Sequence, residues 1–145
     1  MFTLRCTRSL LKRLNVAPDP SPPASTNRLG DWYAKLLYTK PQQLILCVSQ
    51  HTLLPVVIIA KGSEPVAVRL AAGVAKTLQS IGISGRAVDA ELAAMADVAI
   101  STTASRQVLG SMNDFASLME AYLVHGDALA QAALKLADAP CSPIG

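Results

Sequence analysis

Apolar and polar residues alternate over residues 2–7 and then give way to nearly continuous apolar runs, the two patterns that β-strands leave in a sequence. Three further strands are predicted at 32–39, 43–49 and 53–60, with turns at 40–42 and 50–51. Connections this short predict antiparallel hairpins, because a parallel pair needs a long crossover. The apolar character of the runs 43–49 and 53–60 predicts that both are central strands.

Helical spacing dominates the rest of the chain. Val66, Leu70, Val74 and Leu78 predict a helix that ends at Gly82. Further elements are predicted as a basic helix after the first strand, a short helix at 89–95, a strand at 98–102, and helices at 105–124 and 127–136. Strands and helices are largely segregated along the chain. The pattern therefore predicts an α+β fold, an antiparallel sheet of four to five strands with helices packed on one face.

The length of 145 residues is typical of one domain. We expect residues 1–139 to form a single α+β domain and residues 140–145 to form a flexible tail. Within the domain, the stretch 17–27 contains four of the nine prolines. Proline fixes φ and removes a backbone donor, so this stretch is predicted to be an extended surface loop.

Composition narrows the class of protein. Hydrophobic residues make up 51% of the chain, which excludes a disordered protein of low hydrophobicity. The longest apolar run, 53–60, is far shorter than the roughly 20 residues of a membrane-spanning helix. Cys6, Cys47 and Cys141 are widely spaced and form no disulfide framework or thiolate zinc motif, which favours a reducing compartment. The basic segment 1–15 superficially resembles a transit peptide, but a short strand and helix explain it, so we expect a cytoplasmic protein.

The net charge of +3 is unevenly distributed. Up to Lys76 there are ten Lys/Arg against three acids, and the remainder is acidic. This asymmetry suggests a nucleic-acid-binding hypothesis in which a basic face contacts phosphates. Its candidate contacts are Arg5, Arg8, Lys12, Arg13, Arg28 and Lys35. The modest total charge and the absence of helix-turn-helix, zinc-finger and RNA-binding signatures argue against it.

Two stretches carry a resemblance to a known family. The first is Asn-Arg-Leu-Gly-Asp-Trp-Tyr-Ala at 27–34, with the runs at 43–49 and 52–57, and the second is Ser-Arg-Gln-Val-Leu-Gly-Ser-Met-Asn-Asp-Phe at 105–115. Together they resemble a bacterial family of short proteins described only as a domain of unknown function. The resemblance implies a bacterial protein with one such domain and brings no activity or cofactor. Members tend to carry Asn at the position of Lys35 and an acid–base pair at Gln50 and His51, so a function that needs that charged pair is disfavoured here.

Candidate binding residues lie in the same two stretches. Arg106, Ser111, Asn113 and Asp114 suggest a polar anion-recognition site at the start of the long helix. Gly110 within that helix suggests close approach of a ligand or of another backbone. The competing interpretation is that Asn113 and Asp114 bond neighbouring backbone while Gly110 permits tight packing. Trp32 and Tyr33 are adjacent in a strand, so one should be buried and the other exposed for stacking, although a core Trp that anchors the sheet is the favoured reading.

Catalytic signatures are absent from the sequence. There is no GxSxG elbow, no phosphate loop, and no second metal ligand near His51 or His125. We therefore expect no cofactor and no metal site, and we favour a non-enzymatic protein. The leading hypothesis is a protein-interaction module of a bacterial cytoplasmic protein, which binds another protein or itself through the last helix or an open sheet edge. The alternatives are nucleic-acid binding through the basic half and a small-anion-binding enzyme with its site near Arg106.

Overall fold

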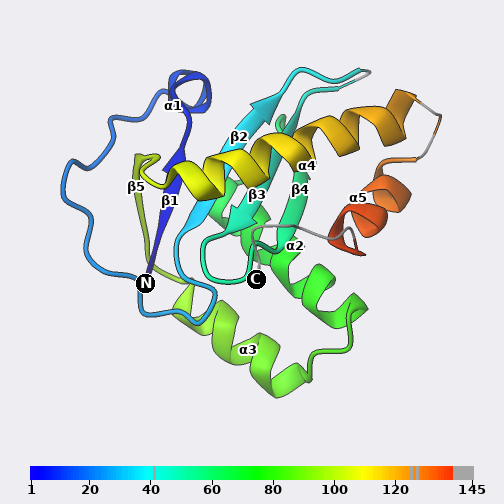
Figure 1. The fold of residues 1–145 in the computed structure, drawn as a ribbon. Coiled ribbons are helices and arrows are strands. Elements are labelled where there is room, and N and C mark those ends of the chain that lie inside the picture. Colours follow the sequence, from blue (N-terminus) through cyan, green and yellow to red (C-terminus); the bar gives the residue numbers. More distant parts are fainter. Residues whose placement is uncertain (41, 125, 127, 139–145) are drawn as a thin grey trace.

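The computed structural model describes residues 1–40, 42–124, 126 and 128–138, and its centre is one five-stranded sheet (Figure 1). The strands are β1 (Phe2–Cys6), β2 (Trp32–Leu37), β3 (Leu44–Ser49), β4 (Pro55–Ile59) and β5 (Val98–Thr102). Their order across the sheet is β4-β3-β2-β1-β5. The α+β class predicted from the sequence is confirmed, and the sheet has five strands where four to five were predicted.

The sheet is mixed, so the prediction of a purely antiparallel sheet is wrong. β2, β3 and β4 form the two expected hairpins, with Ala34 opposite Cys47 and Cys47 opposite Val56. β1 instead runs parallel to both β2 and β5. The chain between β1 and β2 includes a helix and the proline-rich stretch, which provides the length that a parallel crossover needs.

The helices cover both faces of the sheet, so the prediction of helices on one face is also wrong (Figure 1). One face packs against α1 (Arg8–Leu14), α2 (Val66–Ser80) and α3 (Gly85–Ala94). The other packs against α4 (Arg106–Val124) and α5 (Leu129–Asp138). All six residues of β3 are buried, because a strand covered on both sides has no polar face.

Adjacent residues of β2 enter the two different cores. Trp32 belongs to the core beneath α1–α3 and is 0% exposed, while Tyr33 belongs to the core beneath α4 and α5 and is 1% exposed. The expectation that one of them faces solvent is wrong, since both faces of β2 are covered. The strand at 55–59 is an edge strand and not a central one. Its apolar character follows from contacts with α2 and with α5.

Both edges of the sheet are partly protected against further pairing. The proline-rich stretch lies beside β5, where the Asp19 N–H donates to Ile100 O at 2.7 Å and the Ser101 hydroxyl donates to Asp19 O at 2.6 Å. β4 begins at Pro55, which has no N–H to offer, and its end is covered by the Arg69 guanidinium, which donates to Ile59 O. The loop at 17–27 thus covers an edge as well as linking two elements.

Within the described residues, no helix is both long enough and apolar enough to cross a bilayer. The predicted tail at 140–145, together with Cys141 and His125, lies outside the described residues.

Candidate functional site

The topology brings several strand ends to one edge of the sheet. β1, β2, β4 and β5 all point the same way, so their carboxyl ends lie together with the amino termini of α1, α2 and α4. β1 and β5 are neighbours, yet β1 leads into α1 on one face and β5 into α4 on the other. In open sheets, ligands bind in the crevice where adjacent strands send their connections to opposite faces. This topology therefore places a candidate binding site at the carboxyl edge of the sheet.

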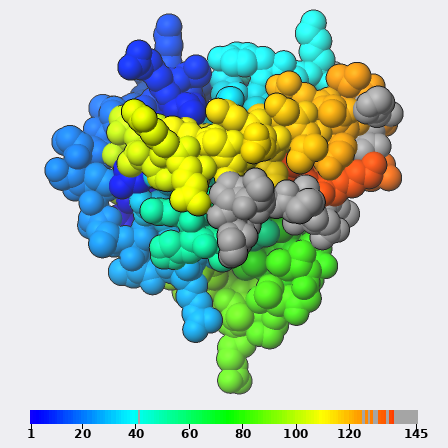
Figure 2. Space-filling model, in the orientation of Figure 1, coloured from blue at the N-terminus to red at the C-terminus, as the bar shows by residue number. Residues whose placement is uncertain are grey.

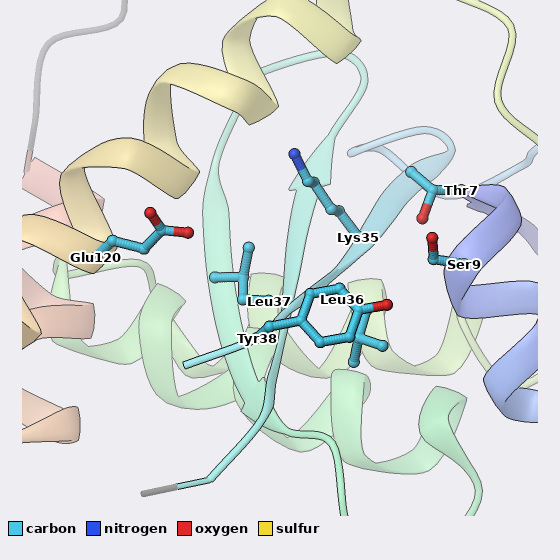
Figure 3. A pocket seen from close by; sticks show the side chains of 7 residues that line it. All are labelled: Thr7, Ser9, Lys35, Leu36, Leu37, Tyr38 and Glu120. Carbon is cyan, nitrogen blue, oxygen red and sulfur yellow. The ribbon is translucent and has the colours of Figure 1, made fainter. Parts of the chain in front are cut away.

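A cavity of about 300 Å³ opens near this point, between α1 and α4 and above the end of β2 (Figure 3). We call it the edge cleft. Its lining residues come from the start of α1, the end of β2 and the second half of α4: Thr7, Ser9, Lys35, Leu36, Leu37, Tyr38 and Glu120. The volume is at the lower end of the roughly 300–1,000 Å³ typical of small-molecule pockets.

Lys35 carries the positive charge of the edge cleft. It is half-buried on β2, and its Nζ donates to Asn113 Oδ1 on α4 at 2.9 Å. Among the described residues, no carboxylate oxygen lies within 4 Å of this Nζ. The ion pair in the described part of the chain joins Arg5 Nε to Asp31 Oδ2 at 2.7 Å and does not involve Lys35. A lysine ammonium has three N–H donors, and one of them donates to the neutral Asn113 amide, so two N–H groups remain for a ligand. Lys35 is thus positioned without neutralisation of its charge.

Hydroxyl groups stand on the opposite wall of the edge cleft, at the start of α1 (Figure 3). Thr7 precedes the helix, and its N–H donates to Ala34 O at 3.1 Å, which fixes the start of α1 against β2. The Thr7 Oγ1 atom is buried and has no hydrogen-bond partner among the described residues. Ser9 is exposed. Because the Thr7 Oγ1 atom is itself buried, the hydroxyl that a ligand in the cleft can reach on this wall is that of Ser9.

Tyr38 and Glu120 complete the lining. Tyr38 follows the last residue of β2 and is 69% exposed. Glu120 projects from α4 on the side of the cleft away from Thr7 and Ser9 (Figure 3). The cleft therefore combines an ammonium, the accessible hydroxyl of Ser9, an aromatic ring and a carboxylate at the end of β2.

Basic residues outnumber acids around the carboxyl edge. They lie on α1, in the β2–β3 and β4–α2 connections, and at the start of α4: Arg8, Lys12, Arg13, Lys40, Lys61 and Arg106. The acids of the same region are Glu64, Asp114 and Glu120. Three helix amino termini add their partial positive charge at this edge. The local potential therefore favours an anion.

The candidate residues at 106–114 do not form one cluster. Arg106, Asn113 and Asp114 are exposed, whereas Ser111 is 0% exposed and faces the core. Asn113 reaches the edge cleft through Lys35. A Cβ added at Gly110 would meet no described atom within 4 Å, so the interpretation that this glycine allows close packing against another part of the described chain is wrong. The close approach of a ligand there stays a prediction.

Tyr33 has a structural role at the start of α4 that the sequence pattern did not predict. Its hydroxyl oxygen accepts from the Ser105 N–H at 2.9 Å, next to the amino terminus of α4, and Ser105 Oγ accepts from the Val108 N–H. Buried Trp32 and Tyr33 offer no open ring for stacking.

The six candidate nucleic-acid contacts are divided between two ends of the molecule. Arg8, Lys12, Arg13 and Lys35 lie at the carboxyl edge. Arg28 is exposed in the loop before β2, at the opposite end of that strand. Arg5 is ion-paired with Asp31 and donates to Thr102 O, a bracing role within the sheet.

The loop at 27–31, part of the first motif, is held from two sides. The Asn27 amide and the Arg28 N–H donate to Glu91 on α3, each at 2.9 Å. Gly30 has φ 77°, and a Cβ there would lie 2.8 Å from the ring of His51. His51 Nδ1 is in turn 3.0 Å from Arg28 O. This motif fixes the start of β2, while the second motif supplies core residues of α4 and the partner of Lys35.

Sequence reasoning missed Thr7, Ser9, Tyr38 and Glu120. Thr7 and Ser9 directly follow a strand, and a pair of hydroxyl residues at a carboxyl strand end was the available signal. Glu120 carried no comparable signal in the sequence. In the described part of the chain, no group of three His, Cys, Asp or Glu side chains could hold a metal ion.

Residues 3–145 match the model of a protein family described as a domain of unknown function, DUF6933. The match extends over nearly the whole chain, so the chain belongs to this family, and the family resemblance seen in the sequence is confirmed. No curated protein and no solved structure matches the chain.

Proposed function

We propose that this member of the DUF6933 family is a binding protein for a small anionic ligand, and that the edge cleft is its site. The observation that carries the proposal is Lys35, which lines the cleft, donates from Nζ to the neutral amide of Asn113 at 2.9 Å, and has no described carboxylate within 4 Å. The exposed hydroxyl of Ser9 on the facing wall provides a further donor to a carboxylate or phosphate oxygen.

Charge and placement support the same proposal. The basic residues around the carboxyl edge raise the local concentration of anions, and this effect weakens as salt screens it. The cleft has the size of a small-molecule pocket, and its lining combines polar groups with the exposed ring of Tyr38. The proposal keeps the small-anion hypothesis drawn from the sequence but moves its centre from Arg106 to Lys35.

Isothermal titration calorimetry with inorganic phosphate, citrate and ribose 5-phosphate at low salt tests this function. At least one of these probes should bind, and Lys35→Gln should weaken it by about tenfold or more, because a hydrogen bond to a charged group is worth roughly 1.5–3 kcal/mol. Lys76→Gln is the matched control, since it removes the same charge from an exposed position on α2. Equal affinity of the two variants would refute the site, and no binding of any probe would refute the function.

The leading hypothesis from the sequence, a protein-interaction module of a bacterial cytoplasmic protein, stays a prediction. One feature that favours it is the pair Ile81 and Ile83, 46% and 41% exposed on either side of Gly82 between α2 and α3. Light scattering coupled to size-exclusion chromatography tests self-association. A concentration-dependent dimer that Ile81→Ser and Ile83→Ser abolish together would support this second function, and a monomer at high concentration would oppose self-association.

A further inference from the structure

Tyr38 is unusual among the aromatic residues of this chain, all of which lie in the described part. The rings of Phe2, Trp32, Tyr33 and Phe115 are buried, and Tyr122 is half-buried beneath the Lys135 ammonium. Tyr38 alone is largely exposed, at 69%, and it lies on the lining of the edge cleft (Figure 3). An exposed ring at the mouth of a pocket is a platform on which a planar ligand can stack.

Leu36 and Leu37 add little to this platform. Their side chains enter the two different cores and are 5% and 2% exposed, so they offer almost no side-chain surface to a ligand. The ring of Tyr38 is therefore the apolar surface that a flat, weakly hydrated group would contact, and the donors for a phosphate lie at Lys35 and Ser9.

Glu120 sets a further requirement on the ligand. Its carboxylate lines the wall away from Thr7 and Ser9, and no described cation pairs with it within 4 Å (Figure 3). A carboxylate accepts hydrogen bonds from hydroxyl groups and repels phosphate. It therefore favours a ligand with hydroxyls and disfavours a chain of phosphates, and a cavity of about 300 Å³ limits the ligand to a single unit.

We infer that the edge cleft binds a ribonucleoside monophosphate. The phosphate contacts Lys35 and the hydroxyl of Ser9, the base stacks on Tyr38, and the ribose hydroxyls donate to Glu120. This inference rests on the proposed function and adds the class of ligand. It also distinguishes the cleft from a polynucleotide-binding surface, because the carboxylate and the small volume oppose successive phosphates.

The test compares related ligands by calorimetry on the full chain at low salt. The probes are the four ribonucleoside 5′-monophosphates, ribose 5-phosphate, adenosine and a six-nucleotide single-stranded RNA. We expect at least one monophosphate to bind about tenfold or more tightly than ribose 5-phosphate, because of the stacked base. Adenosine, which lacks the phosphate, should bind more weakly than adenosine monophosphate, and the RNA should not exceed the best monophosphate.

Variants separate the base from the phosphate. Tyr38→Leu should weaken the best monophosphate by about tenfold and leave ribose 5-phosphate unchanged, while Tyr38→Phe should keep the affinity of both. Tyr38 is exposed, so neither change should affect folding. Glu120→Gln should weaken the 2′-hydroxyl-containing monophosphate more than its 2′-deoxy counterpart.

The outcomes that overturn the inference differ from those that overturn the function. If ribose 5-phosphate binds as tightly as every monophosphate, and Tyr38→Leu changes neither affinity, the base is not recognised, although an anion-binding cleft remains. If the RNA binds more tightly than every monophosphate, the inference is also overturned, because the ligand would then be a polynucleotide and not a single nucleotide. If no phosphate-containing probe binds, both the inference and a phosphate-binding cleft are refuted.

Discussion

The side-chain amide of Asn27 donates to Glu91 Oε2 at 2.9 Å, a contact that joins the loop before β2 to α3 across 64 positions of the chain. The other carboxylate oxygen accepts from the Arg28 N–H at 2.9 Å, and Glu91 is only 5% exposed. A buried carboxylate that accepts hydrogen bonds on both oxygens is costly to replace, because each donor would lose its partner away from water.

Glu91→Gln should therefore lower the free energy of unfolding by about 2 kcal/mol, since the new amide N–H₂ would face a donor. Urea unfolding at neutral pH measures the change. Asp89→Asn on the same helix is the control, because Asp89 is exposed and its substitution should stay within about 0.5 kcal/mol. A Glu91 variant as stable as that control would show that the clamp contributes nothing.

Removal of the Tyr33 hydroxyl group should destabilise the protein at the start of α4. In Tyr33→Phe the ring still fills its core, but the Ser105 N–H loses the oxygen that accepts from it at 2.9 Å. We expect a loss of about 1 kcal/mol in unfolding free energy. Tyr38→Phe removes the same group from an exposed ring and should be neutral. Similar unfolding midpoints for the two variants would contradict the assignment.

Gly30→Ala should destabilise the protein. The residue has φ 77°, and the added Cβ would lie 2.8 Å from the His51 ring. The left-handed backbone alone costs about 1–2 kcal/mol for an L side chain, and movement of the His51 ring adds to it. Thermal unfolding followed by circular dichroism would show a lower midpoint; an unchanged midpoint would mean that the loop relaxes freely.

Gly110→Ala should have the opposite effect. Gly110 lies inside α4, where a Cβ would meet no atom within 4 Å. Alanine restricts the unfolded chain and favours the helix, so stability should rise by about 0.5–1 kcal/mol. The same thermal unfolding experiment compares it directly with Gly30→Ala. A loss of stability would indicate that another part of the chain uses this surface.

The two described cysteines should make the protein sensitive to alkaline pH. Burial raises the pKa of the Cys6 thiol from 9.0 to about 12, and it raises that of Cys47 as well. The folded state therefore keeps protons that the unfolded state releases as pH rises above 9, so stability falls between pH 9 and about 12 and is unaffected below that window.

Each buried thiol should lower the free energy of unfolding by about 1.4 kcal/mol between pH 8 and pH 10. Urea unfolding of the Cys141→Ser variant at the two pH values measures the summed loss of unfolding free energy from Cys6 and Cys47. The substitution removes the third thiol, Cys141, which lies outside the described residues, so that it does not contribute to the measured change. When Cys6→Ala is added, the loss of unfolding free energy between pH 8 and pH 10 should become smaller by the contribution of one thiol. An identical decline with and without Cys6 would argue against this linkage.

Most of the local elements were predictable, because each strand or helix imposes its own period on the apolar residues. The hairpins at 32–59 followed from turns too short for a crossover, and the helices at 66–80 and 106–124 followed from their apolar stripes. The apolar run of β3 also indicated that both its faces are covered, a signal that the one-face prediction overlooked. Lys35 and Asn113 were named as candidates, but for different sites.

The sequence alone determined which residues avoid water and how they repeat, and hence the five strands, the helices and the α+β class. Only the tertiary structure decided which neighbour buries each apolar face, since the hydrophobic effect is non-directional and a burial pattern does not name its partner. It thus placed β1 between β2 and β5, divided the helices between two faces, and brought Thr7, Lys35 and Glu120 from distant segments to one cleft.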